Sequence, residues 1–248
     1  MEEDANFCIS MPLLYYTARA FFMGDIMKKE KLIKISVTGV FCALAFILTT
    51  VLRFKVAFLS FDLKDTIIAV VSLMYGPLYG VVSSGIVAFL EFLSVSDTGV
   101  YGLIMNFISS ATFAFVAGMI YKYKRTFTGA ILAVLFSVIS VSVVMCLANI
   151  VVTPYYMGVS AKEVIALIPT LLLPFNLCKS VINAAATVII YKPIRKILIK
   201  SRVVVSDTAQ NNKSLLKNIL VCVISLLIIA ITVVFLILSL GGKIQFFS

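Results

Sequence analysis

Long apolar runs separated by short polar segments dominate the pattern of this chain. Several runs approach or exceed the roughly 18–20 residues with which a helix crosses a bilayer, and the weaker alternation of a membrane β-barrel is absent. The pattern therefore predicts an all-α integral membrane protein. The apolar runs occupy residues 32–52, 66–93, 99–122, 128–153, a segment that contains Pro174 and ends at Tyr191, and 215–240.

The run 66–93 could form one span or two short helices. It is interrupted by Tyr75-Gly76-Pro77, and Gly followed by Pro is a strong helix breaker. If the break makes two helices, most Lys and Arg residues fall in segments on one side of the membrane, as the positive-inside rule requires of a cytoplasmic face. We therefore predict a six-helix bundle with a cytoplasmic N-terminus, followed by a seventh transmembrane helix.

Composition along the chain predicts four parts. Residues 1–26 begin with acidic residues, unlike a signal peptide, and are expected to be an N-terminal extension without a role in the core function. The six-helix membrane domain is expected over 27–202, a polar linker over 203–214, and the additional transmembrane helix with a short tail over 215–248.

The composition supports a membrane protein and disfavours several other classes. Hydrophobic residues make up 62% of the chain and charged residues 13%, against about 45–50% and about 25% in soluble domains. The net charge of +10 comes from Lys and Arg clustered between the spans, which indicates topology rather than nucleic-acid binding. There is no histidine, and the five cysteines lie far apart, so neither a metal site nor a disulfide framework is indicated.

Motifs of common enzymes are also missing from the sequence. It contains no Walker-type phosphate loop and no serine in a Gly-x-Ser-x-Gly context. An enzyme would have to use Asp62, Asp65 or Glu91, the acidic residues near the ends of spans. The two aspartates suit the N-terminus of the helix that follows them, and Glu91 is expected near the outer end of its helix, where water reaches it.

The most informative stretch is the segment from Pro174 to Thr187. At 3.6 residues per turn, Asn176, Lys179 and Asn183 fall on one narrow stripe of a helix. A lysine within a membrane helix is costly unless it faces the protein interior or a wet cavity. The stripe is therefore expected to line a binding site.

Two further asparagines are candidates for the same site. Asn149 lies near the end of the span 128–153 and shares its predicted depth with Asn176 and Lys179. Amides and an ammonium group suit an uncharged small molecule rich in hydrogen-bonding groups, with a flat apolar part. Asn106 is also a candidate, although an interhelical hydrogen bond is the favoured alternative for it.

Three stretches resemble one family. They are Leu-Pro-Phe-Asn-Leu-Cys-Lys-Ser-Val-Ile-Asn at 173–183, Asn-Ile-Val-Val-Thr-Pro-Tyr-Tyr-Met-Gly at 149–158, and the segment from Asp65 through Met-Tyr-Gly-Pro-Leu-Tyr-Gly at 74–80. Together they are similar to the substrate-binding S components of energy-coupling factor (ECF) vitamin transporters, in particular the riboflavin-binding branch. The resemblance covers roughly residues 31–197.

The resemblance implies a bundle that captures riboflavin from outside under a lid formed by the loop after the first helix. Asn149, Asn176 and Lys179 would then hydrogen-bond the ligand. Phe61 would lie in the lid, together with Phe58, and Asp62 next to it; both Phe61 and Asp62 are substrate-binding candidates. No cofactor or metal is implied, since riboflavin is the transported ligand.

The resemblance also implies partners in a bacterial cell membrane. Gly39 and Ala43 fit the small-residue motif on the first helix that docks the transmembrane T component, which works with two ABC ATPases. Packing within this chain is the alternative for these small residues. Three other functions stay open: an S component for another vitamin or small metabolite, since a carboxylate ligand would suit Lys179 equally; a membrane-embedded enzyme acting on a lipid-borne substrate; and a purely structural subunit.

Overall fold

The computed structural model describes residues 29–56, 59–94, 98–200, 215–240 and 244–245. The predicted extension 1–26 and linker 203–214, and Phe58 in the predicted lid, lie outside the described residues. Thr38–Ser248 form one compact unit, which contains the candidate site.

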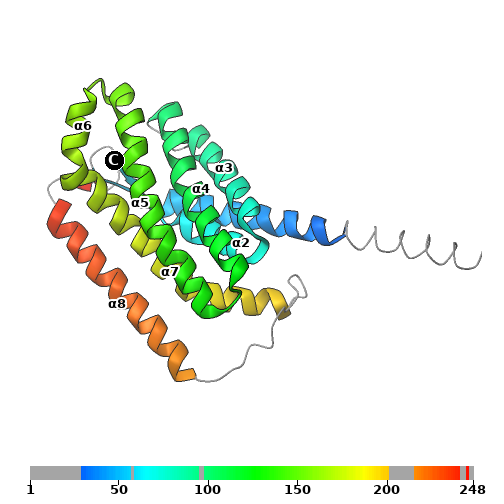
Figure 1. The fold of residues 1–248 in the computed structure, drawn as a ribbon. Helices are drawn as coiled ribbons and strands as arrows, with labels where there is room; N and C mark the ends of the chain where they lie inside the picture. The colour runs from blue at the N-terminus through cyan, green and yellow to red at the C-terminus, as the bar shows by residue number, and fades with distance from the viewer. Residues whose placement is uncertain (1–28, 57–58, 95–97, 201–214, 241–243, 246–248) are drawn as a thin grey trace, which may run out of the picture. The chain divides into compact units, whose positions relative to one another are not determined.

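The described elements confirm the predicted helical class (Figure 1). Six helical segments are long and apolar enough to cross a membrane, counted over the described residues. In chain order the elements are the first helix Lys29–Val51, β1 Phe54–Val56, β2 Leu59–Phe61, α2 Lys64–Tyr75, α3 Pro77–Ser94, α4 Gly99–Tyr123, α5 Phe127–Met157, α6 Ala161–Leu167, the π-helix η1 Ile168–Leu172, α7 Leu173–Lys200, α8 Leu215–Leu240 and β3 Ile244–Gln245.

The predicted break between the second and third helices is confirmed. Gly76 ends α2 with a φ of 104°, a conformation that favours glycine, and Pro77 begins α3. With 12 residues, α2 spans about 18 Å, less than the thickness of a bilayer core. Because its residues from Lys64 to Leu73 are buried, α2 forms the inside of the bundle.

Small residues allow α2, α3 and α4 to approach closely. The Ser72 hydroxyl in α2 donates to the Ala114 carbonyl in α4. A Cβ added at Gly118 would lie 2.8 Å from Pro77 Cα, and one added at Gly80 would lie 2.6 Å from Ser72 Cβ. These small residues therefore serve packing within the chain.

The segment after the first helix, expected from the resemblance to be a loop, contains two strands. β1 and β2 form an antiparallel hairpin, and β3 from the C-terminal end of the chain pairs with the other edge of β1. Periodicity gives no signal for strands of two or three residues, so the sequence analysis missed this sheet.

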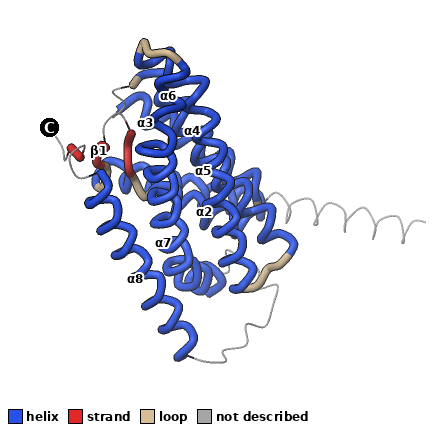
Figure 2. The backbone as a smooth tube through the Cα atoms, turned by 60° about the vertical axis from the view of Figure 1, so that its left-hand side comes forward, coloured by secondary structure: helices blue, strands red, loops and turns tan. Residues whose placement is uncertain are grey.

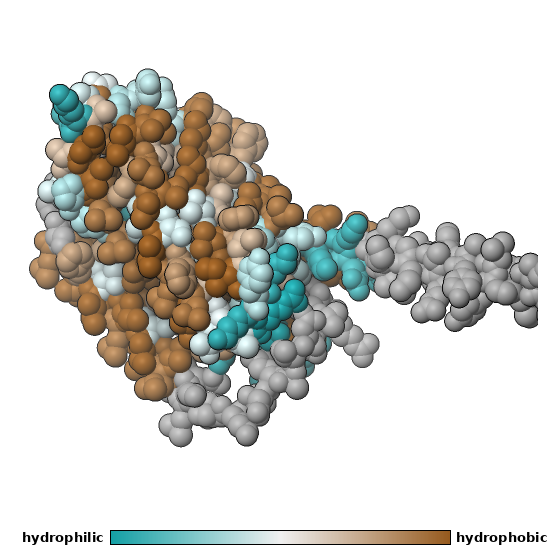
Figure 3. Space-filling model, in the orientation of Figure 1, coloured by the Kyte–Doolittle hydropathy of each residue, from teal (hydrophilic) through white to brown (hydrophobic). Residues whose placement is uncertain are grey.

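The predicted seventh helix is confirmed as α8, which lies along α7 (Figures 1 and 2). Most of its described side chains are exposed, and they are almost all apolar. The space-filling view shows apolar side chains spread over this face of the molecule (Figure 3). An exposed apolar surface of this kind fits contact with lipid.

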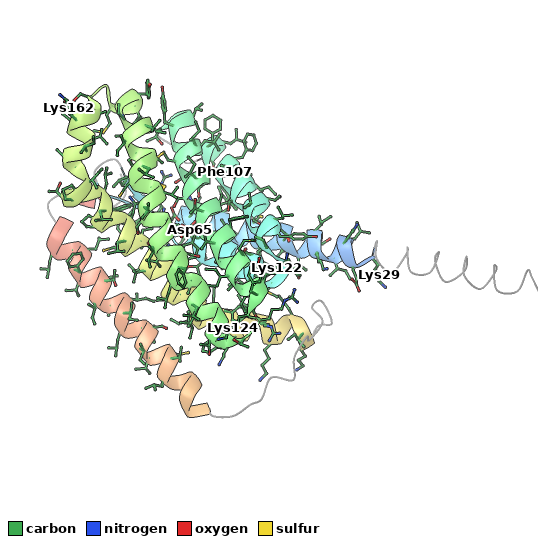
Figure 4. The ribbon with its side chains drawn as sticks, viewed as in Figure 1. Lys29, Asp65, Phe107, Lys122, Lys124 and Lys162 are labelled. Carbon is green, nitrogen blue, oxygen red and sulfur yellow. The ribbon has the colours of Figure 1, made fainter. Side chains whose placement is uncertain are left out.

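Basic residues gather at one end of the bundle. Lys122 and Lys124 lie at the turn between α4 and α5, whereas Lys162 lies at the opposite end, near the start of α6 (Figure 4). Arg125 also lies in the turn between α4 and α5. The last turns of α7 carry Arg195, Lys196 and Lys200. The positive-inside rule predicts that the end rich in basic residues faces the cytoplasm.

Candidate ligand-binding site

A pocket opens between the β1–β2 hairpin, α4, α5 and α7. It encloses about 670 Å³ of empty space, a figure that includes space open to solvent. The lining residues are Arg53, Leu59, Ser60, Thr98, Tyr101, Gly102, Met105, Asn106, Ser109, Met145, Asn149, Val152, Thr153, Tyr156, Phe175, Asn176 and Lys179.

The polar stripe of α7 supplies two of these residues, Asn176 and Lys179. The π-helical turn η1 lies directly before α7, and such turns are frequent at functional sites. Asn176 donates one N–H to the Leu172 carbonyl at 2.8 Å. Its side-chain oxygen accepts no hydrogen bond from the described part of the chain, so it can accept one from a ligand.

Asn149 reaches the pocket from α5. It donates to the Met145 carbonyl at 2.7 Å and accepts from the Thr153 hydroxyl at 2.8 Å. These two bonds fix the orientation of the amide and leave one of its two N–H groups for a ligand. The predicted convergence of Asn149 with Asn176 and Lys179 is therefore seen in one pocket.

The ammonium group of Lys179 joins α7 to the hairpin. Lys179 Nζ donates to Asp62 Oδ2 at 2.9 Å and to the Ser60 carbonyl at 3.1 Å. A lysine has three N–H donors, so one remains for a ligand. Burial alone would raise the pKa of the Asp62 carboxyl, but the adjacent ammonium groups of Lys179 and Lys64 lower it to about 2.

A second buried ion pair lies behind the pocket. Lys64 Nζ contacts the two carboxylate oxygens of Glu91 at 2.8 and 2.7 Å, and both side chains are almost fully buried. The expectation that water reaches Glu91 is therefore wrong, because Lys64 from α2 and Asn106 from α4 cover its carboxylate.

Asn106 occupies a position compatible with both of the roles considered for it. It donates to Glu91 Oε2 at 2.8 Å, which is the interhelical hydrogen bond favoured from sequence. It also lines the pocket. Its side-chain oxygen accepts no hydrogen bond within the described residues, so the side chain can link the buried pair to a ligand.

Asn183 lies one turn beyond Lys179 on α7 and does not line the pocket. Its side-chain oxygen accepts from the Thr66 N–H at 3.0 Å and from the Thr66 hydroxyl at 2.8 Å, and its amide donates to the Asp62 carbonyl at 3.0 Å. The N-terminus of α2 has no side-chain cap from its own N-cap residue Leu63. Asn183 therefore caps α2 from a neighbouring helix, and its groups are used in holding the fold.

Phe61 and Asp62 also lie outside the pocket lining. Phe61 is buried and stacks on Phe54 with ring centroids 4.5 Å apart. Asp62 holds Lys179 and Lys64 in place. The preceding residues of β2, Leu59 and Ser60, line the pocket instead.

Sequence reasoning missed several lining residues, among them Arg53, Tyr101 and Tyr156. Arg53 Nη2 donates to the Ser60 hydroxyl at 3.0 Å, and the rings of Tyr101 and Tyr156 lie 6.2 Å apart at 51°. Tyr156 lies in the stretch 149–158 that carries part of the family resemblance, so the sequence held a signal for it. Arg53 and Tyr101 enter the site only through the packing of the hairpin and α4 beside α5.

The arrangement suits binding of a small polar molecule with a flat part. Amide, ammonium and hydroxyl groups converge among aromatic and apolar side chains, as in most cofactor-sized sites. The three carboxylates that an enzyme would need do not line the pocket: Asp62 and Glu91 hold lysines, and Asp65 accepts from the Ser110 hydroxyl.

Comparisons with known proteins show the family to which the chain belongs. The curated relative "Riboflavin transporter RibU" of Staphylococcus aureus (strain TCH60) is 25% identical over 184 residues, which are 70% of this chain and 95% of the relative. A solved S component of a bacterial ECF transporter matches 66% of this chain and 96% of its own with a TM-score of 0.57; at 24% identity this likeness supports the fold. The family model "ECF transporter, substrate-specific component" matches residues 34–191. The chain therefore belongs to the family of substrate-specific components of ECF transporters.

Proposed function

We propose that this protein captures riboflavin from outside the cell and delivers it through an ECF-type ABC importer. The observation that carries the proposal is the convergence of Asn149, Asn176 and Lys179 on one pocket, each with hydrogen-bonding capacity left for a ligand. Riboflavin is uncharged and combines a flat ring system with a polyhydroxyl chain, which matches both the polar and the aromatic lining. The riboflavin transporter among the relatives supports the same ligand.

The position of the pocket supports capture from outside. Its lining includes Thr98 and Tyr101 at the start of α4 and Thr153 and Tyr156 near the end of α5. The basic turn between α4 and α5 lies at the other ends of these two helices. With the basic end in the cytoplasm, the pocket opens outward and the N-terminus is cytoplasmic.

Asn176→Ala is expected to weaken riboflavin binding roughly tenfold or more, because it removes an acceptor in a partly desolvated site. The matched control is Leu177→Ala, the next residue of α7, whose side chain is 43% exposed and does not line the pocket. Both variants would be titrated with riboflavin in detergent by quenching of flavin fluorescence. Equal affinities of the two variants would move the binding site away from Asn176.

The first helix offers a surface for a membrane partner. Gly39 and Ala43 are exposed, and a Cβ added at Gly39 would meet no atom within 4 Å. Packing within the described part of the chain therefore does not explain these small residues. We propose that this face docks the transmembrane T component, which assembles with two ABC ATPases.

Gly39→Leu is expected to abolish co-purification with a T component while riboflavin binding stays unchanged, because a large side chain prevents close helix approach. The control is Val40→Leu, which enlarges a neighbouring exposed side chain. Complex formation would be measured by affinity pull-down from membranes in which the transporter subunits are co-expressed. A fully assembled complex with Gly39→Leu would exclude this docking face.

A further inference from the structure

The C-terminal part of the chain extends beyond the segment shared with the family. The family model matches residues 34–191, whereas α8 and β3 follow at Leu215–Leu240 and Ile244–Gln245. A helix that served only to anchor the chain in the membrane would not need a strand after it. In this chain β3 also pairs with the hairpin beside the pocket.

β3 adds a strand to that hairpin. It pairs antiparallel with β1, with Lys55 opposite Gln245 and Val56 opposite Ile244. The other edge of β1 pairs with β2, whose Leu59 and Ser60 line the pocket. Figure 2 shows β1 beside the C-terminal end of α8. The chain thus covers the edge of β1 that would otherwise be unpaired.

α8 holds the same hairpin through side chains. Leu236 is 3% exposed and belongs to one apolar cluster with Leu59 and Phe61 of β2 and Phe175 of α7, and Ile229 packs against that cluster. Within the described part of α8, Leu236 is the large apolar side chain that is buried, and most of the other apolar side chains are exposed. Leu236 thus joins α8 to the hairpin, while the helix as a whole packs along α7.

We propose that α8 and β3 form a strap that fastens the β1–β2 hairpin over the pocket and slows the passage of ligand in both directions. A two-stranded hairpin is only marginally stable, whereas a third strand and a covering helix stabilise it. Opening the pocket by moving the hairpin then requires that the β1–β3 backbone hydrogen bonds break. The proposal rests on the proposed function only for the identity of the ligand.

The strap can be tested through access to the pocket, without a ligand. Met105 lines the pocket from α4, and Met105→Cys can be placed in a chain whose five native cysteines are replaced by alanine. Its rate of modification by a bulky maleimide would be measured in the full chain, after deletion of residues 241–248, and after deletion of 246–248, which keeps β3. Gln245→Pro is a second variant, which disrupts the pairing of β3 with β1 in the full-length chain. Proline has no backbone N–H to donate to the neighbouring strand.

We expect modification to be about tenfold faster without residues 241–248 and faster with Gln245→Pro, but unchanged without 246–248. Release of bound riboflavin is expected to accelerate in the same variants. Equal modification rates in the full chain and the 241–248 deletion would overturn the strap, as would rates that rise equally in both deletions. Failure of the full chain to bind riboflavin would refute the proposed ligand, while the maleimide rates would still decide the strap.

Discussion

Lys64→Met is expected to lower the free energy of unfolding by about 3–5 kcal/mol, the usual cost of removing one partner from a buried ion pair. Lys64 is 1% exposed and contacts Glu91 at 2.7 Å and Asp62 at 3.5 Å. Among the described residues, its loss would leave Glu91 with only the hydrogen bond from Asn106. The change would be measured as a lower unfolding midpoint in detergent.

The double variant Lys64→Met, Glu91→Gln separates the buried charge from other effects of the substitution. It removes the uncompensated carboxylate and is expected to recover part of the lost stability. Single and double variants of equal stability would show that the pairing of Lys64 with Glu91 contributes little to the fold.

Lys179→Met is expected to weaken riboflavin binding by roughly 10- to 100-fold, since hydrogen bonds to charged groups contribute about 1.5–3 kcal/mol. The substitution removes a donor that lines the pocket. It also releases the Ser60 carbonyl and the Asp62 carboxylate of the hairpin segment. Riboflavin titration of the purified variant measures the loss.

Because Lys179→Met also leaves a buried carboxylate with fewer partners, a second variant is needed to separate binding from stability. In Lys179→Met, Asp62→Asn the unpaired charge is removed, so stability is expected to recover while riboflavin binding stays weak. Recovery of binding along with stability would mean that Lys179 supports the fold and does not contact the ligand.

Features that depend on neighbouring residues could be predicted from the sequence. The break at Gly76 and Pro77 is a property of two residue types. The convergence of Asn176 and Lys179 follows from helical periodicity and from the cost of a lysine in a membrane helix. Asn149 could be placed with them because topology fixes the depth of each helix end.

Features that depend on contacts between distant segments could not be predicted. Asn176 and Asn183 lie on the same stripe, but only the structure shows that Asn176 faces the pocket while Asn183 caps α2. Likewise, Glu91 was expected near water, since its partner Lys64 is distant in sequence and approaches it only through the packing of α2 against α3. Arg53 enters the site only because the hairpin folds back over the pocket.

The central claim is that this pocket binds riboflavin, and equilibrium titration of the purified full chain with riboflavin tests it most directly. The account predicts saturable, tight binding of one riboflavin per chain, lost or strongly weakened in Asn176→Ala and Lys179→Met. Absence of binding by a folded wild-type protein would contradict the account, and would direct the search to another vitamin or small metabolite on the same scaffold.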